Sequence, residues 1–283
     1  NDNQITIGRN VKPGQFVRSK GLDFREGQTL LSAGTPLNSR HVALASGMNV
    51  PWVSVIRKPR VAILSTGNEL VLPGEPMGPE QIVSSNSIGL TAFVNGAGGV
   101  GINLGIAKDN FASISDLLAG IEGADMLVTI GGASVGEYDL VETVLGDKGL
   151  DVTFSRVAMR PGKPLIFGRI RGKPMLGLPG NPVSAGVTAV LFLKPAIYQM
   201  LGRTYKTDPK ETAILGLDLE KNDRRQDYLR STLSWGDTGE LFVTPFKKQD
   251  SSMLAVFTKA DCLTVRAPLA PPASKGCPSK TTS

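Results

Sequence analysis

The sequence predicts an α/β protein built on a three-layer, doubly wound and mostly parallel sheet, with a glycine-rich segment before it and a small β-domain after it. Between residues 60 and 201, short apolar runs alternate with longer segments of helical spacing, which is typical of strands covered by helices on both faces. Residues 1–56 are rich in turns instead. Residues 212–265 hold strand-like runs such as TAILGLDL and ELFVTPF, broken by turns about every ten residues.

Length and composition limit the classes of protein to which the chain can belong. A length of 283 residues predicts about two domains. The 31 Lys and Arg against 25 Asp and Glu give a net charge of +6, which suits an anionic small molecule. Basic runs and interleaved aromatic residues, which are typical of nucleic-acid binders, are missing. The composition therefore argues against a nucleic-acid partner.

The cysteines and the histidine indicate the cellular compartment, and the first residues indicate whether the chain is part of a longer protein. Cys262 and Cys277 form no CxxC motif and His41 is the single histidine, which argues against a disulfide framework or a structural zinc site and fits a reducing, cytoplasmic setting. We expect no membrane span, because by sequence no apolar run is expected to reach the length of one, and the polar start NDNQITIGRN does not resemble a signal peptide. Because this start lacks an initiator Met, we expect the chain to be a piece of a longer protein.

The first 56 residues predict short strands, many turns and one helix over residues 38–47. Asn38 or Ser39 would cap that helix. A segment this short and this rich in glycine buries little apolar surface by itself. We therefore expect residues 14–51 to pack across a two-fold interface onto the α/β domain of a second subunit.

The central region predicts six strands and four helices in alternation. The expected strands are short apolar runs over residues 60–64, 100–106, 126–130, 152–157, 165–167 and 175–178. The expected helices cover residues 85–95, 112–121, 137–145 and 182–201, the first of them capped by the cluster of Ser84, Ser85 and Asn86.

The stretch ADMLVTIGGASVGEYD, residues 124–139, changes from strand to glycine turn to helix within sixteen residues. Gly131 and Gly132 end the apolar strand, and a helix follows the small residues after them. Backbone N–H groups of such a turn can bind an anion beside the open helix N-terminus. The residues leave two interpretations of Asp139 open, since it could cap the helix or hold a metal ion beside a phosphate.

Polar residues follow each expected strand at its carboxyl end, where open α/β sheets bind ligands. Each has an ordinary structural explanation: Glu69 as a solvated loop acid, Asp109 as an N-cap, and Lys163 as a surface cation. Asn181 could likewise be an N-cap, with Pro182 at the first helical position. Three acids, two glycine turns and cations on one rim favour a phosphorylated substrate with Mg²⁺.

Five motifs in order resemble the MoeA family, the molybdopterin molybdenumtransferases, which include the E domain of gephyrin. They are STGNEL (65–70), SNS (85–87), LVTIGGASVGEYD (127–139), VAMRPGKP (157–164) and LGLPGNPVSA (176–185). The similarity extends to VRSKGLDFREGQTLLSAGTPL upstream and to DYLRSTL and KKQDSSML downstream, and so covers nearly the whole chain. It implies an elongated N-terminal part, a molybdopterin-binding-like α/β domain and a C-terminal β-barrel. It also implies Mg²⁺-dependent insertion of molybdenum from molybdate into adenylylated molybdopterin, with release of AMP.

The resemblance implies roles for individual residues. Catalytic positions are Asp23, Glu69, Asp109, Asp139 and Lys163, of which Glu69, Asp109 and Asp139 would hold Mg²⁺ and Asp23 could serve the neighbouring subunit's pocket. Positions implied to bind the pterin or the oxyanion are Thr66, Gly67, Ser85, Asn86, Gly131, Gly132, Ser134, Gly136, Arg160, Pro179, Gly180, Asn181, Pro182, Arg230 and Ser251. For Arg230 and Ser251, a barrel that only mediates dimerisation explains the residues equally well.

The resemblance also implies domain boundaries, and the sequence differs from the family pattern in two places. We expect an N-terminal arm over 1–56, the α/β domain over 57–204, the barrel over 205–270 and a disordered tail over 271–283, because PPASKGCPSKTTS is polar and rich in proline. A SAMDGYA-type loop of the family is absent from the sequence, which makes the activity of this piece alone an open question.

Two other functions compete with the transferase. A molybdopterin-binding or adenylylating relative would use the same central fold, but the barrel and KKQDSSML argue against it. A non-catalytic dimeric scaffold would leave a receptor-binding motif, and none is recognisable. The expected partners are the pterin, molybdate, a second copy of the chain and a molybdopterin adenylyltransferase.

Overall fold

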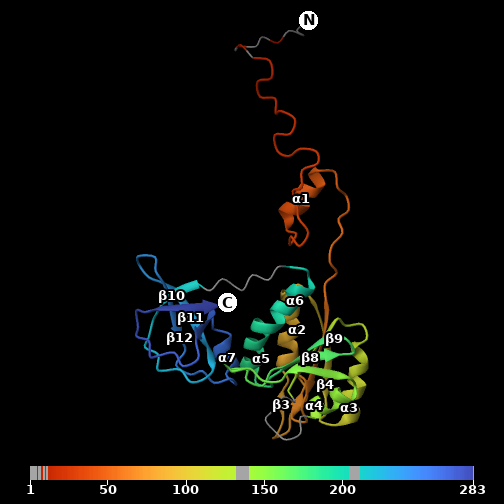
Figure 1. Cartoon of the computed structure of the whole chain (residues 1–283), viewed down its shortest axis with the longest axis vertical. Helices are drawn as coiled ribbons and strands as arrows, with labels where there is room; N and C mark the ends of the chain where they lie inside the picture. Colours follow the sequence, from red (N-terminus) through yellow and green to blue (C-terminus); the bar gives the residue numbers. More distant parts are fainter. Residues whose placement is uncertain are drawn as a thin grey trace. The chain divides into compact units, whose positions relative to one another are not determined.

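The computed structural model divides the chain into two compact units, residues 1–53 and residues 54–283 (Figure 1). The structure describes residues 5, 8, 10, 12–131, 140–203 and 211–282, without the side chains of 140–142 and 211.

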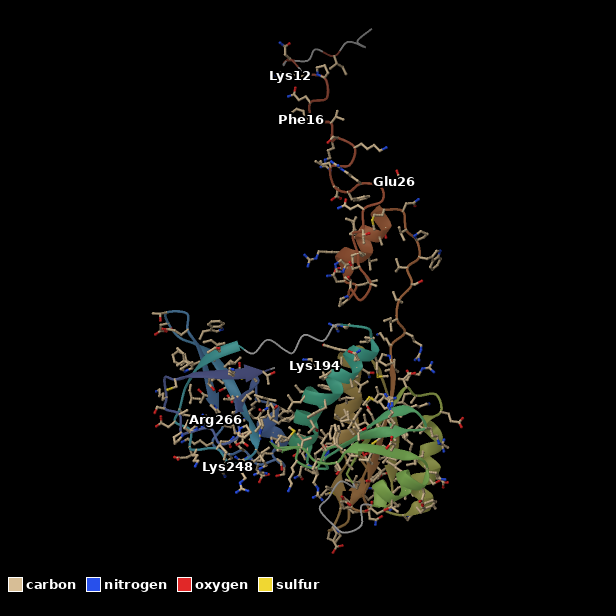
Figure 2. All side chains as sticks on the ribbon, viewed as in Figure 1. Lys12, Phe16, Glu26, Lys194, Lys248 and Arg266 are labelled. Carbon is tan, nitrogen blue, oxygen red and sulfur yellow. The ribbon has the colours of Figure 1, made fainter. Side chains whose placement is uncertain are left out.

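The first unit contains helix α1, Ser39–Gly47, as the sequence predicts. Its N-cap is Asn38, whose side chain accepts hydrogen bonds from the backbone of Arg40 and His41, while the His41 ring accepts the Asn38 N–H. No strand forms among the described residues of this unit, so the expected short strands are wrong. A strand needs a neighbour for its backbone groups, and this segment leaves even large apolar side chains exposed, with Phe16 94% and Trp52 88% accessible (Figure 2).

The second unit is organised around a six-stranded sheet in the order β4-β1-β5-β9-β8-β6. The neighbouring strands β4, β1, β5 and β9 are parallel to one another, whereas β8 is antiparallel to both of its neighbours. The bounds are β1 Arg60–Thr66, β4 Val100–Ala107, β5 Met126–Ile130, β6 Leu150–Phe154, β8 Ile166–Ile170 and β9 Lys173–Leu178. A separate parallel pair, β2 Leu70–Val71 and β3 Ile82–Val83, follows β1. The mostly parallel sheet that the alternation predicts is therefore confirmed.

Helices cover both faces of this sheet, which makes three layers (Figure 1). Alternate residues of β1 point to opposite faces: Val61 packs with α2 and the long helix after β9, and Ala62 packs with α3 and α4. The helices are α2 Asn86–Gly96, α3 Phe111–Leu118 with a 3₁₀ turn at Ala119–Ile121, α4 Leu140–Asp147, α5 Pro182–Thr188 and α6 Lys194–Met200.

The long helix over Pro182–Met200 is interrupted by a π-helical stretch, Ala189–Leu193. Pro195 lacks the N–H that would bond back into the preceding turn, which favours such a distortion. By length and a mean hydropathy of 1.3, this helix is apolar enough to cross a membrane, so the expectation that no apolar run reaches that length is wrong. Val187 and Leu193 are nevertheless fully buried in the protein, as in a core helix.

The last part of the chain closes a β-barrel in the order β12-β10-β14-β13-β11, with β11 pairing back to β12. The strands are β10 Glu211–Leu215, β11 Gln226–Trp235, β12 Leu241–Pro245, β13 Cys262–Arg266 and β14 Pro278–Thr282, and a short helix α7, Leu254–Phe257, precedes β13. Outside the barrel, β7, Met159–Arg160, pairs with the beginning of β11. Strand β6, which the sequence predicts to extend to residue 157, ends at Phe154.

The C-terminal segment differs from the disordered tail that its composition predicts. Strand β14 lies between β10 and β13 and pairs antiparallel with both. Backbone hydrogen bonds to two neighbours order this polar segment, and Thr281 is buried in it. The expectation of disorder is thus wrong for residues 278–282.

Candidate active site

Two acidic residues occupy adjacent turns at the carboxyl ends of β1 and β4. The Asn68 N–H donates to Asp109 Oδ2 at 3.2 Å, and the Asp109 N–H donates to Asn68 Oδ1 at 3.1 Å, so the two turns hold each other. The N-cap of α3 is Asn110, whose side chain accepts the Ser113 N–H. The alternative explanation of Asp109 as a helix cap is therefore wrong. Its exposed carboxylate keeps acceptor positions for a ligand.

The Glu69 carboxylate folds back over Gly67. A Cβ atom at Gly67 would stand 2.7 Å from both carboxylate oxygens of Glu69, and the Gly67 φ of +154° lies in a region that favours glycine. The Gly67 N–H donates to the Ala107 carbonyl at the end of β4. The glycine therefore lets the Glu69 carboxylate lie against the same turn that Asn68 joins to Asp109.

A buried hydroxyl lies beside the glycine turn after β5. Thr66 is 3% exposed, and within the described part of the chain its Oγ1 has no hydrogen-bond partner. A Cβ atom at Gly131 would meet the Thr66 carbonyl oxygen at 2.7 Å and its Oγ1 at 3.3 Å, so only glycine fits at this turn. Because buried polar groups are nearly always paired, an unpaired hydroxyl here marks a place where a ligand can bond.

Four of the candidates lie outside the described residues. They are Gly132, Ser134, Gly136 and Asp139, and their roles stay predictions from the sequence.

The Pro179–Pro182 turn ties the α/β domain to the barrel. Asn86 Nδ2 donates to the Gly180 carbonyl at 2.6 Å. Asn181 occupies the N-cap position of α5 with Pro182 at its start, but the Asn181 side chain makes no capping bond. Its Nδ2 donates instead to Ser251 Oγ at 2.9 Å, so the ordinary N-cap explanation is wrong in that respect.

The cap expected for α2 also differs from the structure. Ser85 stands at the N-cap position of α2 without a side-chain hydrogen bond to the helix. Its backbone lies in the helical region, from which the hydroxyl does not reach the N–H groups of the first turn. Ser84 and Ser87 face each other instead, with their hydroxyl oxygens 3.5 Å apart.

Arg230 lies inside the barrel wall and is only 1% exposed. Its Nη2 donates to the Asp250 carbonyl at 3.0 Å, and its Nε has no partner among the residues that the structure describes. Burial lowers the pKa of the guanidinium, and the nearby charge of Asp250 opposes that shift. Gln249 holds the Arg230 backbone on both sides, since its side chain accepts the Arg230 N–H and donates to the Arg230 carbonyl. Arg230 is therefore held by Gln249 and by the carbonyl of Asp250, the residue that precedes Ser251.

The two cations of the VAMRPGKP motif have different surroundings. Lys163 is exposed, and across the described residues its ammonium group has no hydrogen-bond or ion-pair partner. Arg160 donates through Nε to Asp227 at 2.9 Å, pairs with the same carboxylate through Nη2, and reaches Asp223 at 3.4 Å. Arg160 thus links β7 to the barrel, and its guanidinium is already occupied by acids.

This link predicts a stability effect. Asp227→Ala should lower the free energy of unfolding by about 2 kcal/mol, because it removes a two-point bond to a carboxylate whose side chain is 5% exposed. The half-exposed Arg160 can return to water, which limits the loss. Urea unfolding measures it, with the exposed acid Asp237→Ala as the matched control. Equal midpoints for the two variants would contradict this role.

Asp23 belongs to the first unit, where it is exposed in a turn-rich segment. Its role stays a prediction. Asn68 and Gln249 are positioning residues that the sequence did not single out. The signals were their places inside quoted motifs, since Asn68 belongs to STGNEL and Gln249 belongs to KKQDSSML.

The donor set suits magnesium bound together with a phosphate. No cluster of three or more Asp, Glu, His or Cys forms within the described ranges, from which Asp139 is missing. Mg²⁺ is usually held by one or two carboxylates together with substrate phosphates and water. Glu69 folded over Gly67, beside a turn bonded to Asp109, fits that pattern.

Two regions of the chain match known protein families. Residues 62–199 match the model of a "probable molybdopterin binding domain", and residues 212–277 match the "MoeA C-terminal region (domain IV)". A molybdopterin molybdenumtransferase of Nostoc is 38% identical, with 82% of this chain and 54% of the relative aligned. One of Haemophilus influenzae is 34% identical, with 93% and 66% aligned.

A solved structure shows the same fold. The molybdopterin biosynthesis MoeA protein of Pyrococcus horikoshii superposes with a TM-score of 0.80 at 33% identity, over 93% of this chain and 63% of that one. The chain thus spans roughly half to two thirds of the length of these relatives. With both regions matched in order and the fold shared, the chain belongs to the MoeA family.

Proposed function

We propose that the chain is the larger part of a molybdopterin molybdenumtransferase, which inserts molybdenum from molybdate into adenylylated molybdopterin and releases AMP. The observation that carries the proposal is that the turn at Pro179–Pro182 is bonded both to the α/β domain, through Asn86, and to the barrel, through Ser251. Carboxylates lie after β1 and β4, a buried hydroxyl without a partner among the described residues ends β1, and in the barrel a buried guanidinium bonds the carbonyl of the residue before Ser251.

The acidic side of the rim suits the adenylate phosphate. Glu69 and Asp109, together with Asp139, would hold Mg²⁺, which offsets the negative charge of the phosphate groups at the bond that breaks. The Thr66 hydroxyl and the backbone N–H groups of the Gly131–Gly132 turn would donate to the phosphate oxygens. Asn86, by fixing the Gly180 carbonyl, keeps the wall of the pocket in place.

The barrel side suits the oxyanion. Ser251 Oγ accepts a hydrogen bond from Asn181, so its own proton stays available to donate to molybdate. Arg230 Nε, which has no partner in the described part of the chain, supplies a charged donor, and Lys163 supplies a second positive charge. Gly67, Ser85, Gly132, Ser134, Gly136, Pro179 and Pro182 remain proposed pterin-pocket positions.

The function is tested by incubating the full-length enzyme with adenylylated molybdopterin, Mg²⁺ and molybdate. AMP should appear only when molybdate is present. Pyrophosphate release from a nucleoside triphosphate would instead identify the adenylylating relative and overturn the proposal. In the same proposal the enzyme acts in the cytoplasm and receives its pterin from a molybdopterin adenylyltransferase.

We further propose a homodimer formed through the first unit, with Asp23 at the neighbouring subunit's pocket. Exposed apolar side chains in this unit, such as Phe16 and Leu22, have no core to join within the unit. Phe16→Glu should therefore weaken the dimer in sedimentation, whereas Trp235→Glu, at an exposed aromatic residue of the barrel, should not. A well-folded wild-type monomer at micromolar concentration would count decisively against the dimer.

A further inference from the structure

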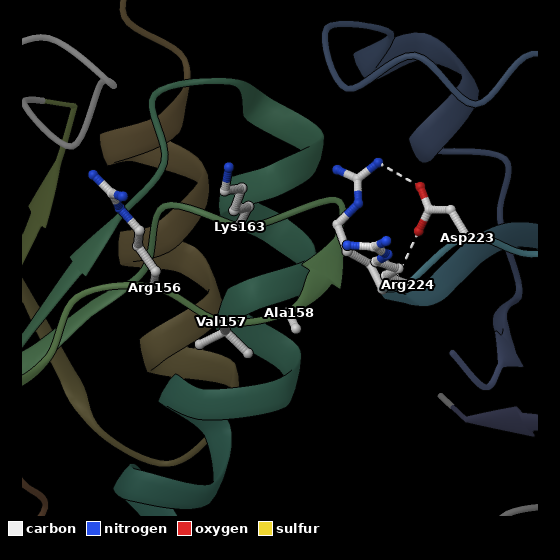
Figure 3. A pocket seen from close by; sticks show the side chains of 7 residues that line it. Arg156, Val157, Ala158, Lys163, Asp223 and Arg224 are labelled. Carbon is white, nitrogen blue, oxygen red and sulfur yellow. Dashed lines mark hydrogen bonds and ion pairs between the residues drawn. The ribbon is translucent and has the colours of Figure 1, made fainter. Parts of the chain in front are cut away.

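A second basic site lies where the segment after β6 meets the barrel. A pocket of about 730 Å³ is lined there by Val157, Ala158 and five charged residues, namely Arg156, Lys163, Asp223, Arg224 and Arg225. Figure 3 shows Arg156 and Lys163 on the side of the α/β domain and Arg224 and Asp223 on the side of the barrel. Both domains thus contribute positive charge to one hollow.

The acid in this pocket is already neutralised. Asp223 Oδ2 pairs with Arg225 Nη2 at 2.8 Å and with Arg160 Nη1 at 3.4 Å, and Oδ1 accepts the Arg225 N–H at 2.7 Å. Bonds from Arg225 lower the pKa of Asp223 to about 2, so this carboxylate remains ionised and paired throughout the neutral range. Asp223 therefore does not neutralise the other three cations of the pocket.

The three other cations of the pocket have no acidic partner in the part of the chain that the structure describes. Arg156, Lys163 and Arg224 make no side-chain hydrogen bond or ion pair within the described residues. Like charges that share a concave surface repel one another, and an anion that enters relieves this repulsion. The volume exceeds what a bare oxyanion requires and falls in the range of pockets for small organic ligands.

We propose that Arg156, Lys163 and Arg224 form a binding subsite for the phosphate group of an organic phosphate or diphosphate ester. Guanidinium groups bind two phosphate oxygens at once, and an ammonium group adds a compact charge. The apolar Val157 and Ala158 beside them offer a surface to the organic part of the ligand. Lys163 is the one residue that this subsite shares with the proposed transferase site, and only in this respect does the subsite rest on the proposed function. Phosphate binding at the subsite requires neither metal nor molybdate.

The test is equilibrium binding of inorganic pyrophosphate, AMP and adenosine to the chain by calorimetry, without divalent cations. Pyrophosphate and AMP should bind and adenosine should not. Arg156→Ala and Arg224→Ala should each weaken pyrophosphate binding about tenfold. Arg169→Ala is the matched control, because Arg169 lies toward the opposite end of β8 from Lys163 and carries the same charge. It should leave the affinity unchanged.

Two further binding measurements distinguish this subsite from the proposed transferase site. Glu69→Gln should bind pyrophosphate as the wild type does, because Glu69 does not line the pocket. AMP binding should strengthen from pH 5 to pH 7 as its phosphate loses a second proton near pH 6, while the Asp223 carboxylate of the pocket stays ionised over that range because its pKa is lowered to about 2. Unchanged affinity in Arg156→Ala and Arg224→Ala, or an equal loss in Arg169→Ala, would overturn the subsite whether or not the enzyme releases AMP.

Discussion

Glu69→Gln and Asp109→Asn should each lower Mg²⁺-dependent AMP release by the full-length enzyme about a hundredfold or more. Each change removes one negative charge of the proposed metal site and keeps the shape of the side chain. In Asp109→Asn the amide oxygen can still accept the Asn68 N–H, so the two turns remain joined. The loss should therefore come from charge alone.

Stability distinguishes this effect from misfolding. Both acids are exposed, so thermal unfolding should change little in either variant. Glu80→Gln provides the control, because Glu80 is an exposed acid of the connection between β2 and β3 and loses the same charge. It should keep wild-type turnover. Near-normal AMP release in Glu69→Gln or Asp109→Asn would remove these acids from the proposed site.

Arg230→Lys should raise the molybdate concentration for half-maximal AMP release about tenfold while leaving the affinity for adenylylated molybdopterin close to wild type. Lysine keeps the charge but loses the planar set of donors, which includes the Nε that no described residue bonds. The competing explanation, a pair with an acid on the barrel surface, does not fit a side chain that is 1% exposed and bonded to a carbonyl. Millimolar sulfate, a tetrahedral dianion like molybdate, should compete weakly.

The same residue makes a prediction about stability. A buried guanidinium whose one side-chain hydrogen bond among the described residues goes to a carbonyl is costly, and the charge of Asp250 offsets this cost only in part. Arg230→Met should therefore unfold at the same or a higher temperature than wild type while losing molybdate-dependent turnover. Thermal unfolding and AMP release measure the two effects separately. An unchanged molybdate requirement in Arg230→Lys, or a large loss of stability in Arg230→Met, would assign this side chain a structural role.

The central sheet could be predicted because its buried strands are visible in the sequence as runs of consecutive apolar residues. The run RVAIL of β1 is apolar at consecutive positions, since Val61 and Ala62 enter different layers of the core. Each candidate that follows a strand then falls on the same rim by topology alone. This reasoning places Glu69, Asp109 and Gly131 without any knowledge of side-chain contacts.

Long-range contacts set the features that the sequence did not reveal. Strand β14 is polar, and only its neighbours β10 and β13 make it a strand. The side chain of Asn181 follows the local N-cap pattern, yet it bonds Ser251, seventy positions away. Arg160 directly precedes the PGK turn, and its acidic partners come from the barrel side of the unit. Such partners are fixed by tertiary packing, which local residue patterns do not record.

The most direct test of one site shared by two domains is to measure the binding of labelled molybdate and of adenylylated molybdopterin separately in Glu69→Gln and Arg230→Lys. We expect opposite losses. Arg230→Lys should bind the pterin normally and molybdate weakly, whereas Glu69→Gln should bind molybdate normally and lose the Mg²⁺-dependent part of pterin binding. If both variants lost both ligands equally, or if neither lost either, the proposed division between the sheet rim and the barrel would be contradicted.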